Sequence, residues 1–565
     1  MKTLLFAIAQ LNPTVGDIAG NTKKLAEAYR SATAQDADIV VAPETYLSGY
    51  QVDDLVQVEG FLEEMDKAIH HLASLTANNA PALIVGAPRR DEKGLIRNAV
   101  FVLDDGKIDA IRDKARLPGT GVFDDPRNFI PGELPGPVML RGVRMGLPVC
   151  EDMWHADLIE CLSETGAEML ISCNGSPFEE DKVDDRMMAS VSRVTESGLP
   201  LLYVNLVGGH DDLVFDGASF AVNPGGKIGA YLPSFTESLS LIEAKETPDG
   251  WRFQGAVIEP DRGNTSLWRC ISLGIRDYVE KSGFDRVILG LSGGIDSALV
   301  AALAVDALGA DRVDAVMMPS PYTSQISLDD AAALTRNLGI NLRNLDIDPA
   351  MQSVDAMLAD VFSEASPDLA RENLQSRLRG LALMSISNTT GQMVLTTGNK
   401  SEYATGYATL YGDMCGGYAP LIDVWKTRVF DLCWWRNKNL PKGALGPEKG
   451  TDGGPLIPER IITRPPSAEL RLDQQDTDSL PEYETLDAIM AGLVEKQSSV
   501  ETLIAAGFDA DLTRRCAAML KRAEYKRNQC APGPKLTRRA FYRDRRFPII
   551  NGFPLDKPSS ASDFE

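Results

Sequence analysis

A strand-like run followed by a glycine-rich turn is the strongest chemical signal in the chain. The run Val287–Leu291 is apolar, and the segment at 292–297 reads SGGIDS. Two adjacent glycines let backbone N–H groups approach an anion closely, the serines add hydroxyl donors, and the run Ala298–Leu308 predicts a helix whose N-terminus favours negative charge. The segment lacks the lysine of a Walker A loop, and a Gly-Gly turn after a strand is also common without any ligand. We predict a loop that binds ATP phosphates, formed by Ser292, Gly293, Gly294, Asp296 and Ser297.

Three residues of the first half could form a site that hydrolyses a carboxamide. They are Glu44 in the segment PET, Lys114 in KARLP and Cys150 in CED, and each follows a predicted strand. A deprotonated thiol is a good nucleophile toward an acyl carbon, a carboxylate can accept its proton, and an ammonium can stabilise the tetrahedral oxyanion. Each residue alone also has a structural explanation, since cysteines are often buried, Glu44 could cap a helix, and Lys114 could be a solvated loop charge. Together the three residues predict hydrolysis that needs neither a metal ion nor a histidine.

A second strand end in the C-terminal half carries acidic and basic residues. The segment TTGNKSE at 396–402 follows the apolar run Met393–Leu395, and PLIDVWK at 420–426 ends on a lysine. Mg²⁺ prefers carboxylate and phosphate oxygens, so we predict that Asp296 and Glu402 hold this ion against the departing pyrophosphate. Lys426 could neutralise charge on the α-phosphate. Taken alone, Glu402 could equally be a favourable charge at a helix N-terminus.

The alternation of short apolar runs and amphipathic segments predicts a layered α/β unit in the first half of the chain. Strands are predicted at 4–10, 39–42, 82–86, 98–103 and 142–149, and helices at 21–33 and 59–78. The stretch 242–255 is polar and rich in turn residues, and a new helix is predicted from about residue 264. We therefore predict two domains, at 1–260 and 261–565.

The second half predicts strands alternating with crossover helices. Helices are predicted at 265–282, 298–308 and 328–338, and strands at 286–291, 313–318 and 341–346. This order is typical of a doubly wound parallel sheet, whose ligands bind at the carboxyl ends of the strands. The Gly- and Pro-rich segment 439–459 predicts a mobile surface loop, either a lid or a plain linker. The tail from Lys557 is expected to fray.

Composition and charge restrict the function classes. With 565 residues, 44% of them hydrophobic and 24% charged, the chain is too long for one core and ordinary for a soluble globular protein. The formal net charge of −23 disfavours nucleic-acid binding, which requires a basic face. The 8 cysteines include no CxxC pair, which favours reduced thiols and a cytoplasmic location. No histidine lies beyond His210, so histidine acid–base chemistry is excluded from the C-terminal half.

The N-terminus and the apolar runs do not predict a membrane protein. The opening MKTLLFAIAQ has a short apolar core and no cleavage pattern, so we expect a buried first strand and not a signal peptide. No apolar run reaches the roughly 18 residues that a membrane-spanning helix requires.

Residues 4–240 resemble the nitrilase superfamily, because PET, KxxLP and CED occur in that order and NGSPF follows at 174–178. The resemblance implies an α-β-β-α sandwich and a Glu-Lys-Cys triad formed by Glu44, Lys114 and Cys150. Within the superfamily, NGSPF with Lys182 resembles the glutamine-binding loop of the glutaminase branch, which implies glutamine contacts from Glu151, Ser176 and Lys182. Related glutaminases often have Asn-Tyr after KxxLP, whereas this chain has GT at 119–120, and Phe123 or Phe178 could supply the aromatic contact instead.

Residues 264–550 resemble the NAD synthetase family of adenylating ATP pyrophosphatases. The motifs are SGGxDS, TGNKSE, YGD at 411–413, PLxxxxK at 420–426 and PSAEL at 466–470. Related chains often have Pro-Pro-Gly where this one has APG at 531–533. Besides the SGGIDS loop, the resemblance implies ATP contacts from Met318, Arg379 and Thr397. It implies contacts to deamido-NAD from Asn373, Arg377, Asp413, Lys426, Ser467 and Lys526.

The two resemblances together imply glutamine-dependent synthesis of NAD⁺. Cysteine-catalysed hydrolysis of glutamine would release ammonia, ATP would convert the carboxylate of deamido-NAD into an adenylate, and ammonia would displace AMP. We expect small-molecule substrates only, Mg²⁺ as the cofactor, ATP as a co-substrate and a homo-oligomer. Because free ammonia is mostly protonated at neutral pH, we also expect a dry internal passage for it.

Three other interpretations fit part of the sequence. Adenylating amidotransferases that make GMP or asparagine share the SGGxDS loop but use other glutaminase types, with a Cys-His-Glu triad or a cysteine at position 2, where this chain has lysine. A tRNA-thiolating enzyme would need a basic surface. A nitrilase-like amidase with a disabled nucleotide domain would not need Asp296, Glu402 and Lys426 intact.

Overall fold

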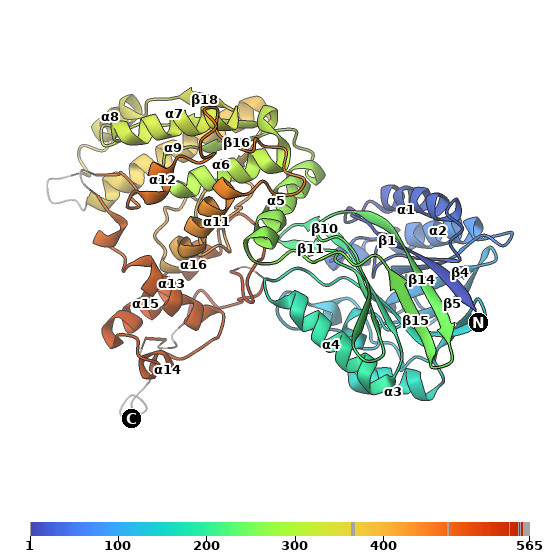
Figure 1. Ribbon diagram of the computed structural model, residues 1–565. Coiled ribbons are helices and arrows are strands. Elements are labelled where there is room, and N and C mark those ends of the chain that lie inside the picture. Colours follow the sequence, from blue (N-terminus) through green and yellow to red (C-terminus); the bar gives the residue numbers. More distant parts are fainter. Residues whose placement is uncertain are drawn as a thin grey trace. The chain divides into compact units, whose positions relative to one another are not determined.

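The computed structural model describes residues 2–362, 368–471, 474–541, 543–551, 553 and 555–556. The chain divides into two compact units, residues 1–262 and 263–565, which are described separately (Figure 1). Across the described part of the chain, no helix combines the length and the hydropathy needed to cross a lipid bilayer. The segment from Lys557, for which we predicted fraying, lies outside the described residues.

Two sheets stack face to face in the first unit. The central strands of each sheet run parallel to one another, and antiparallel strands flank them. The 7-stranded sheet has the order β15 (Gly250–Gly255), β14 (Ser238–Thr247), β1 (Thr3–Gln10), β2 (Ile39–Val41), β3 (Ala82–Arg90), β4 (Ile96–Asp104), β5 (Lys107–Asp113). The 6-stranded sheet has the order β13 (Lys227–Tyr231), β12 (Phe220–Asn223), β9 (Leu201–Asn205), β8 (Met169–Asn174), β7 (Val143–Gly146), β6 (Val138–Leu140). A separate hairpin joins β10 (Val207–His210) and β11 (Leu213–Asp216).

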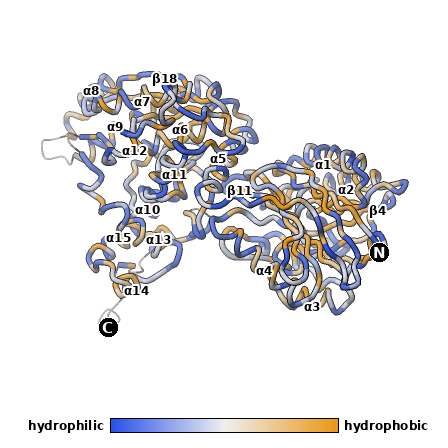
Figure 2. Tube along the Cα trace, viewed as in Figure 1, coloured by the Kyte–Doolittle hydropathy of each residue, from blue (hydrophilic) through white to orange (hydrophobic). Residues whose placement is uncertain are grey.

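Helices cover the outer face of each sheet, which gives the predicted α-β-β-α sandwich. Helices α1 (Ile18–Thr33) and α2 (Phe61–Leu75) lie on one side, and α3 (Ala156–Glu164) and α4 (Lys182–Ser197) lie on the other (Figure 1). Strand β1 shows why the layers form. Phe6 and Ile8 pack between the two sheets, whereas Ala7 and Ala9 pack beneath α1 and α2, since successive side chains of a strand point to opposite faces. Both faces of β1 are therefore buried, and Figure 2 shows the strands of this unit as mainly hydrophobic.

Two predictions for the first unit are wrong in detail. The segment 242–255, predicted to be a turn-rich boundary, forms most of the antiparallel hairpin β14–β15 at the edge of the 7-stranded sheet. Its turn residues sit between the strands, and its polar side chains lie on a half-exposed edge. The strand predicted at 142–149 ends at Gly146, because the chain bends toward the turn at Cys150.

The second unit contains a 4-stranded parallel sheet, which confirms the predicted doubly wound arrangement. Its order is β18 (Asn341–Asn344), β17 (Val313–Met317), β16 (Val287–Gly290), β19 (Met393–Leu395). The chain runs outward from β16 to β18 and then returns to place β19 on the other side of β16. This reversal of strand order creates a crevice at the carboxyl ends of β16 and β19, the usual ligand site of such folds.

The helices of this unit surround the sheet and extend it. Helix α6 is apolar on every side and almost wholly buried, and it begins at Ile295, three residues earlier than predicted, so that Asp296 and Ser297 lie in its first turn. Helix α5 (Gly263–Lys281) precedes the first strand of the sheet. The crossover helices are α6 (Ile295–Leu308), α7 (Gln325–Leu338), α8 (Asp348–Met357) and α9 (Asp368–Thr390). The later helices are α10 (Lys400–Thr405), α11 (Lys426–Lys438), α12 (Glu459–Thr463), α13 (Tyr483–Val494), α14 (Val500–Ala505), α15 (Ala510–Arg522) and α16 (Glu524–Arg527).

The Gly- and Pro-rich segment 439–459 is partly packed and is not wholly the surface loop that we predicted. Leu456 and Ile457 are fully buried. Asn337 of α7 donates a hydrogen bond to Leu456 O at 3.0 Å, and Leu445 N donates to Asp306 O of α6 at 2.9 Å. These contacts tie the segment to two crossover helices.

Candidate functional site

A buried lysine links two carboxylates at strand ends of the first unit. Lys114 follows β5, and its Nζ lies 2.7 Å from Glu44 Oε1 and 2.8 Å from Asp125 Oδ2. Glu44 follows β2 and also accepts hydrogen bonds from Asn98 Nδ2 and Gly175 N, each at 2.8 Å. Burial alone would lower the pKa of Lys114, but the carboxylates of Asp125 and Glu44 raise it well above its ordinary value. The ammonium is therefore permanently charged and held in one place.

Cys150 stands at a sharp backbone turn in electrostatic contact with this lysine. Its φ is +48°, and it begins the 3₁₀ helix Cys150–Trp154. Burial and the Glu44 carboxylate raise the pKa of the thiol well above its ordinary value, whereas Lys114 and the Gly175 N–H lower it. The resting thiol is protonated, so a neighbouring carboxylate must accept its proton before it can attack.

Asp152 connects the lysine segment to the cysteine turn. Its Oδ1 accepts hydrogen bonds from Ala115 N at 3.0 Å and Arg116 N at 2.7 Å, and its Oδ2 accepts one from Val149 N at 3.0 Å. Burial raises the pKa of Asp152 to about 6 despite these bonds. A single buried carboxylate thus fixes the chain on either side of the site.

Two glycines allow the backbone to close around Glu44. A Cβ at Gly86 would lie 2.3 Å from Thr45 N and 2.6 Å from Glu44 Cα. A Cβ at Gly175 would lie 3.0 Å from Glu44 Oε2. Any larger side chain at Gly86 would displace the segment that carries the carboxylate.

A buried ion pair, which we did not predict, holds Ser176. Ser176 Oγ accepts a hydrogen bond from Arg186 Nε at 3.0 Å, and Arg186 Nη2 donates to the carbonyl oxygens of Ser176 and Pro177 at 2.8 Å. Arg186 Nη1 in turn contacts both oxygens of Asp216, at 2.7 and 2.9 Å. The pair makes the segment after β8 rigid.

The other two residues predicted to bind glutamine are more open. The Lys182 ammonium lies 3.4 Å from Glu179 Oε1 and 5.4 Å from the centre of the Phe123 ring. The Glu151 side chain is 30% exposed and lies 3.5 Å from His155 Nε2. Both side chains can still move toward a ligand.

The structure separates the two aromatic residues that we considered for the glutamine contact. The Phe123 ring lies 6.4 Å from the Tyr50 ring, and the Tyr50 hydroxyl donates to Asp125 Oδ1 at 3.2 Å. Phe178 is buried in the core against Phe235, with ring centres 5.3 Å apart. Of these two phenylalanines, Phe123 is therefore the one that lies beside the Lys182 ammonium.

The loop at 292–297 in the second unit has a shape that only glycine permits. Gly293 has a φ of +84°, and a Cβ there would lie 2.4 Å from Ser327 O. Ser292 Oγ lies 3.1 Å from Ser297 Oγ and accepts a hydrogen bond from Gly294 N at 3.1 Å. These hydrogen bonds fix the shape of the loop at the N-terminus of α6, and this arrangement suits an anion.

A buried lysine joins the two predicted metal ligands. Lys426 Nζ forms an ion pair with Asp296 Oδ2 and lies 3.9 Å from Glu402 Oε1. Asn399 Nδ2 donates to Asp296 Oδ1 at 2.8 Å, and Asn399 N donates to Glu402 Oε2 at 3.1 Å. Burial and the neighbouring Asp296 raise the pKa of Glu402 well above its ordinary value, whereas Lys426 lowers it. An additional cation beside these two carboxylates would relieve their repulsion.

Asp476 and Tyr483 complete this cluster, and our sequence analysis missed both. Tyr483 OH donates to Asp476 Oδ2 at 2.8 Å, and the Lys426 ammonium lies 5.3 Å from the centre of the Tyr483 ring. Burial raises the pKa of Asp476, and Lys426 lowers it. Asp476 follows no strand and belongs to no recognised motif, so its sequence context gave no signal.

The PSAEL segment reaches the phosphate loop through α7. Glu469 Oε1 accepts hydrogen bonds from Ser324 Oγ at 2.9 Å, Ser327 Oγ at 2.8 Å and Arg464 Nη2 at 2.5 Å. Ser467 Oγ accepts from Glu469 N at 3.2 Å and donates to a backbone carbonyl at 2.5 Å. Ser327 is also the residue whose carbonyl faces Gly293, so PSAEL and SGGIDS share one support.

Helix α9 carries the predicted nucleotide-binding residues Asn373, Arg377 and Arg379. Arg379 Nε donates to Met318 O at 3.1 Å, and burial lowers the pKa of Arg379 to about 10. Asn373 Oδ1 accepts from Thr409 Oγ1 at 2.8 Å, and Arg377 Nε donates to Leu410 O at 3.3 Å. The helix therefore contacts both the end of β17 and the turn that contains YGD.

The remaining predicted residues lie around that turn and at the end of β19. Asp413 Oδ1 accepts from Thr409 N at 2.7 Å, and burial raises the pKa of Asp413 while Lys526 lowers it. Lys526 Nζ donates to the carbonyl oxygens of Gly406 and Ala408, each at 2.7 Å. Thr397 directly follows β19.

The structure thus gathers the predicted residues into one site in each unit. In the first unit Glu44, Lys114 and Cys150 lie together, and the additional residues are Asp125, Asp152 and the Arg186–Asp216 pair. In the second unit the SGGIDS loop, Asn399, Glu402 and Lys426 meet at the crevice between β16 and β19.

Comparisons with known proteins agree with this division. A family model for carbon-nitrogen hydrolase matches residues 5–252, and one for NAD synthase matches residues 267–530. The chain is 49% identical to a glutamine-dependent NAD(+) synthetase of Rhodobacter capsulatus over 96% of this chain and 98% of that protein. It is 43% identical to the enzyme of the same name from Xanthomonas campestris pv. campestris (strain 8004), over 98% of each chain.

A solved structure supports the same comparison. The glutamine-dependent NAD+ synthetase from Acinetobacter baumannii, in complex with adenosine diphosphate, is 39% identical to this chain, with a TM-score of 0.77. The match covers 98% of this chain and 99% of that one.

Proposed function

This chain belongs to the glutamine-dependent NAD(+) synthetases, and we propose from this premise that its two sites perform the two halves of one reaction. The enzyme synthesises NAD⁺ in an ATP-dependent reaction with glutamine as the nitrogen donor. One observation carries the assignment. A single chain contains both a buried Glu44–Lys114 pair beside Cys150 and a phosphate-binding loop beside Asp296 and Lys426.

The first site hydrolyses the side-chain amide of glutamine. Glu44 accepts the thiol proton as Cys150 Sγ attacks the amide carbon, and the Lys114 ammonium stabilises the oxyanion that forms. Glu44 returns the proton to the amide nitrogen of the tetrahedral species, which then departs as ammonia and leaves a thioester. A water molecule, deprotonated by Glu44, then attacks the thioester and releases glutamate. Asp125 also binds the Lys114 ammonium. The ammonium therefore keeps its position while Glu44 is protonated.

Glutamine binds through Glu151, Ser176 and Lys182. The fixed backbone after β8 supports this role for Ser176, because Arg186 and Asp216 lock its position. The exposed Glu151 carboxylate suits an α-ammonium group, and the Lys182 ammonium suits an α-carboxylate. Their opposite charges match the two ends of a free amino acid.

The second site activates the nicotinate carboxylate of deamido-NAD. The carboxylate attacks the α-phosphorus of ATP, pyrophosphate departs, and ammonia then displaces AMP to give NAD⁺. The SGGIDS loop and the N-terminus of α6 hold the departing pyrophosphate, and Arg379, Met318 and Thr397 line the ATP side. Lys426 neutralises the α-phosphate, and Asn373, Arg377, Asp413, Ser467 and Lys526 hold deamido-NAD.

Asp296 and Glu402 fit a magnesium ion. Both are carboxylates at one crevice, and their closeness to a single ammonium shows that they face a shared point. Among the described residues no group of three His, Cys, Asp or Glu side chains suits a metal ion, so phosphate oxygens would supply further ligands. When bound, Mg²⁺ would stabilise negative charge on the pyrophosphate.

A homo-oligomer and a cytoplasmic location are also part of this proposal. Apolar side chains are exposed on α8 and α9, with Met357 73%, Leu369 61% and Leu381 64% exposed, and they would suit an interface between copies. All eight cysteines are free thiols, as expected in a reducing compartment. Light scattering on the purified protein tests the oligomer.

Substitution of the nucleophile tests the division of labour. Cys150→Ala should abolish NAD⁺ synthesis from glutamine and retain synthesis from ammonium chloride, while Cys161→Ala, a partly exposed cysteine of the same unit, should retain both. Amide-¹⁵N glutamine should label the carboxamide of NAD⁺ in the wild type only. If both activities vanish in a folded Cys150→Ala variant, the proposed roles of the two sites are wrong.

A further inference from the structure

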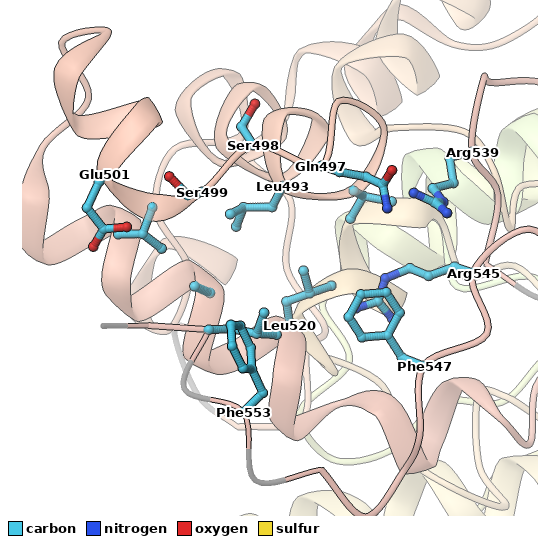
Figure 3. Close-up of a pocket in the computed structure, with 14 residues that line it drawn as sticks. Leu493, Gln497, Ser498, Ser499, Glu501, Leu520, Arg539, Arg545, Phe547 and Phe553 are labelled. Carbon is cyan, nitrogen blue, oxygen red and sulfur yellow. The ribbon is translucent and has the colours of Figure 1, made fainter. Parts of the chain in front are cut away.

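A cavity of about 310 Å³ lies in the C-terminal helical part of the second unit, away from every residue assigned above. The end of α13 and the start of α14 form one wall, α15 forms another, and side chains near the C-terminus, those of Arg539, Arg545, Phe547, Phe553 and Leu555, complete the lining (Figure 3). The volume falls within the range of small-molecule sites. Its lining combines an apolar wall of Leu493, Val494, Leu520 and Phe553 with the guanidinium groups of Arg539 and Arg545.

The arginines place positive charge at one end of this cavity, and Glu501 lines the other end (Figure 3). Arg545 is only 6% exposed, donates to Glu524 Oε2, and stacks its guanidinium 3.7 Å from the centre of the Phe547 ring. Arg527 Nη2 donates to the same oxygen of Glu524 at 2.7 Å. One carboxylate is therefore shared by two nearly buried guanidinium groups.

Arg539 adds a third guanidinium without a carboxylate partner among the described residues. Within the described part of the chain its guanidinium donates one hydrogen bond, from Nε to Asp544 O at 3.2 Å, and Arg539 and Arg545 repel each other electrostatically. Figure 3 shows both side chains directed into the same end of the cavity. A guanidinium has five N–H donors, so most donors of both groups make no hydrogen bond to the described residues.

An anion would satisfy these donors. A carboxylate or phosphate can accept two parallel hydrogen bonds from one guanidinium. The chain carries a formal net charge of −23, so a local cluster of positive charge at a cavity is not a general property of its surface. The apolar wall beside the arginines would contact a ligand with an apolar body better than a fully hydrated inorganic ion.

We propose that this cavity binds a small organic anion, whose carboxylate or phosphate contacts Arg539 and Arg545 and whose flat apolar body packs against Leu493, Leu520 and Phe553. The site lies outside the reaction that we assign to this enzyme. Its wall belongs to α13, whose opposite end carries Tyr483 beside Lys426. Glu495, directly after α13, bonds Lys400 Nζ at 2.9 Å in the TGNKSE segment. A bound anion would thus restrain a helix that contacts the synthetase site.

Calorimetric titration of the full-length protein with benzoate and benzamide tests the proposal. The two probes have the same ring and nearly the same size, and only benzoate is charged. Benzoate should bind with one site per chain and about tenfold or more tighter than benzamide, because charge-assisted hydrogen bonds are the main attraction. Equal binding of both probes, or no saturable binding of benzoate, would overturn the proposal.

A matched pair of arginine variants locates the binding. Arg539→Gln should weaken benzoate binding about tenfold, while Arg538→Gln, the exposed neighbour, should leave it unchanged. Benzoate that binds Arg539→Gln as well as the wild type would occupy another site and refute the assignment. Ammonia-dependent NAD⁺ synthesis measured without benzoate should be unchanged in both variants, so failure of this proposal is distinguishable from failure of the proposed reaction.

Discussion

Replacement of Lys400 by methionine should destabilise the second unit more than any surface substitution. The Lys400 side chain is fully buried, and its Nζ lies 2.7 Å from Asp423 Oδ1 and 2.9 Å from Glu495 Oε1. It also donates to Thr537 Oγ1 at 2.7 Å and to Arg539 O at 3.0 Å. One ammonium thus joins α10, the chain before α11, the end of α13 and the C-terminal segment.

The expected loss follows from the charge left behind. Removal of one partner of a buried ion pair costs about 3–5 kcal/mol, because the other charge stays buried without compensation. Asp423 keeps hydrogen bonds from Leu536 N and Thr537 N, each at 2.7 Å, and electrostatic contact with Lys535, so the lower end of the range applies. A loss of about 3 kcal/mol in a domain of this size corresponds to a fall of roughly 6–12 °C in the Tm of the second unit.

The same change should impair one half-reaction only. Lys400 is the first residue of α10, and Glu402 lies in the first turn of that helix. Ammonia-dependent NAD⁺ synthesis should therefore fall, while glutamine hydrolysis should continue because its residues lie in the first unit. Lys438→Met, an exposed lysine at the end of α11, is the matched control and should change neither property.

Calorimetry and separate assays of the two activities decide the outcome. A Tm within about 2 °C of the wild type would mean a loss under about 1 kcal/mol, and the reasoning about buried charge would then be wrong. Equal loss of glutaminase and synthetase activity would show that Lys400 supports the whole chain and not one unit.

Three further predictions follow from contacts in the two sites. Gly293→Ala should reduce ATP-dependent synthesis at least about tenfold at unchanged glutaminase activity, because an alanine Cβ would lie 2.4 Å from Ser327 O at a φ of +84°; wild-type kinetics would show that the loop has another shape. Asp152→Asn should reveal a pH-dependent contribution. The folded carboxyl has a pKa of about 6 against an ordinary value of 3.8, so its stabilising effect is greatest at low pH and is lost as the pH rises through 6, by about 3 kcal/mol. Urea unfolding at several pH values would contradict this if the difference between wild type and variant stayed constant. Arg186→Met should leave the buried Asp216 uncompensated, lower the stability of the first unit by about 3 kcal/mol and raise the KM for glutamine, without changing ammonia-dependent synthesis; an unchanged KM in steady-state assays would remove Arg186 from the binding site's support.

Local sequence patterns predicted most elements of the central sheets. Strands β1, β2, β16 and β17 begin and end within about two residues of their predicted positions, because each is a short apolar run between turn residues. The hairpin β14–β15 was missed because both strands are only partly buried, so their apolar and polar residues alternate weakly. Strand β14 depends on pairing with β1, and β15 on pairing with β14, and no local pattern contains these pairings.

The same contrast holds for the sites. Glu44 and Cys150 follow predicted strands, Asp296 lies in a recognisable turn and Lys114 begins the KxxLP motif, so their positions were visible before the fold was known. Asp125 was not visible, because it begins a short 3₁₀ turn with no recognised motif, and its role depends on its contact with Lys114.

The order of motifs along the chain determined the family, the two α/β units and the chemistry of each half. Residue type alone settles that a thiol can attack an amide and that a glycine-rich turn can approach a phosphate. The fold decided which charges share a partner: Lys114 lies between Glu44 and Asp125, and Lys426 lies between Asp296 and Glu402. These groupings join residues that are far apart in sequence, and electrostatic coupling depends on distance and burial, which only the tertiary structure sets.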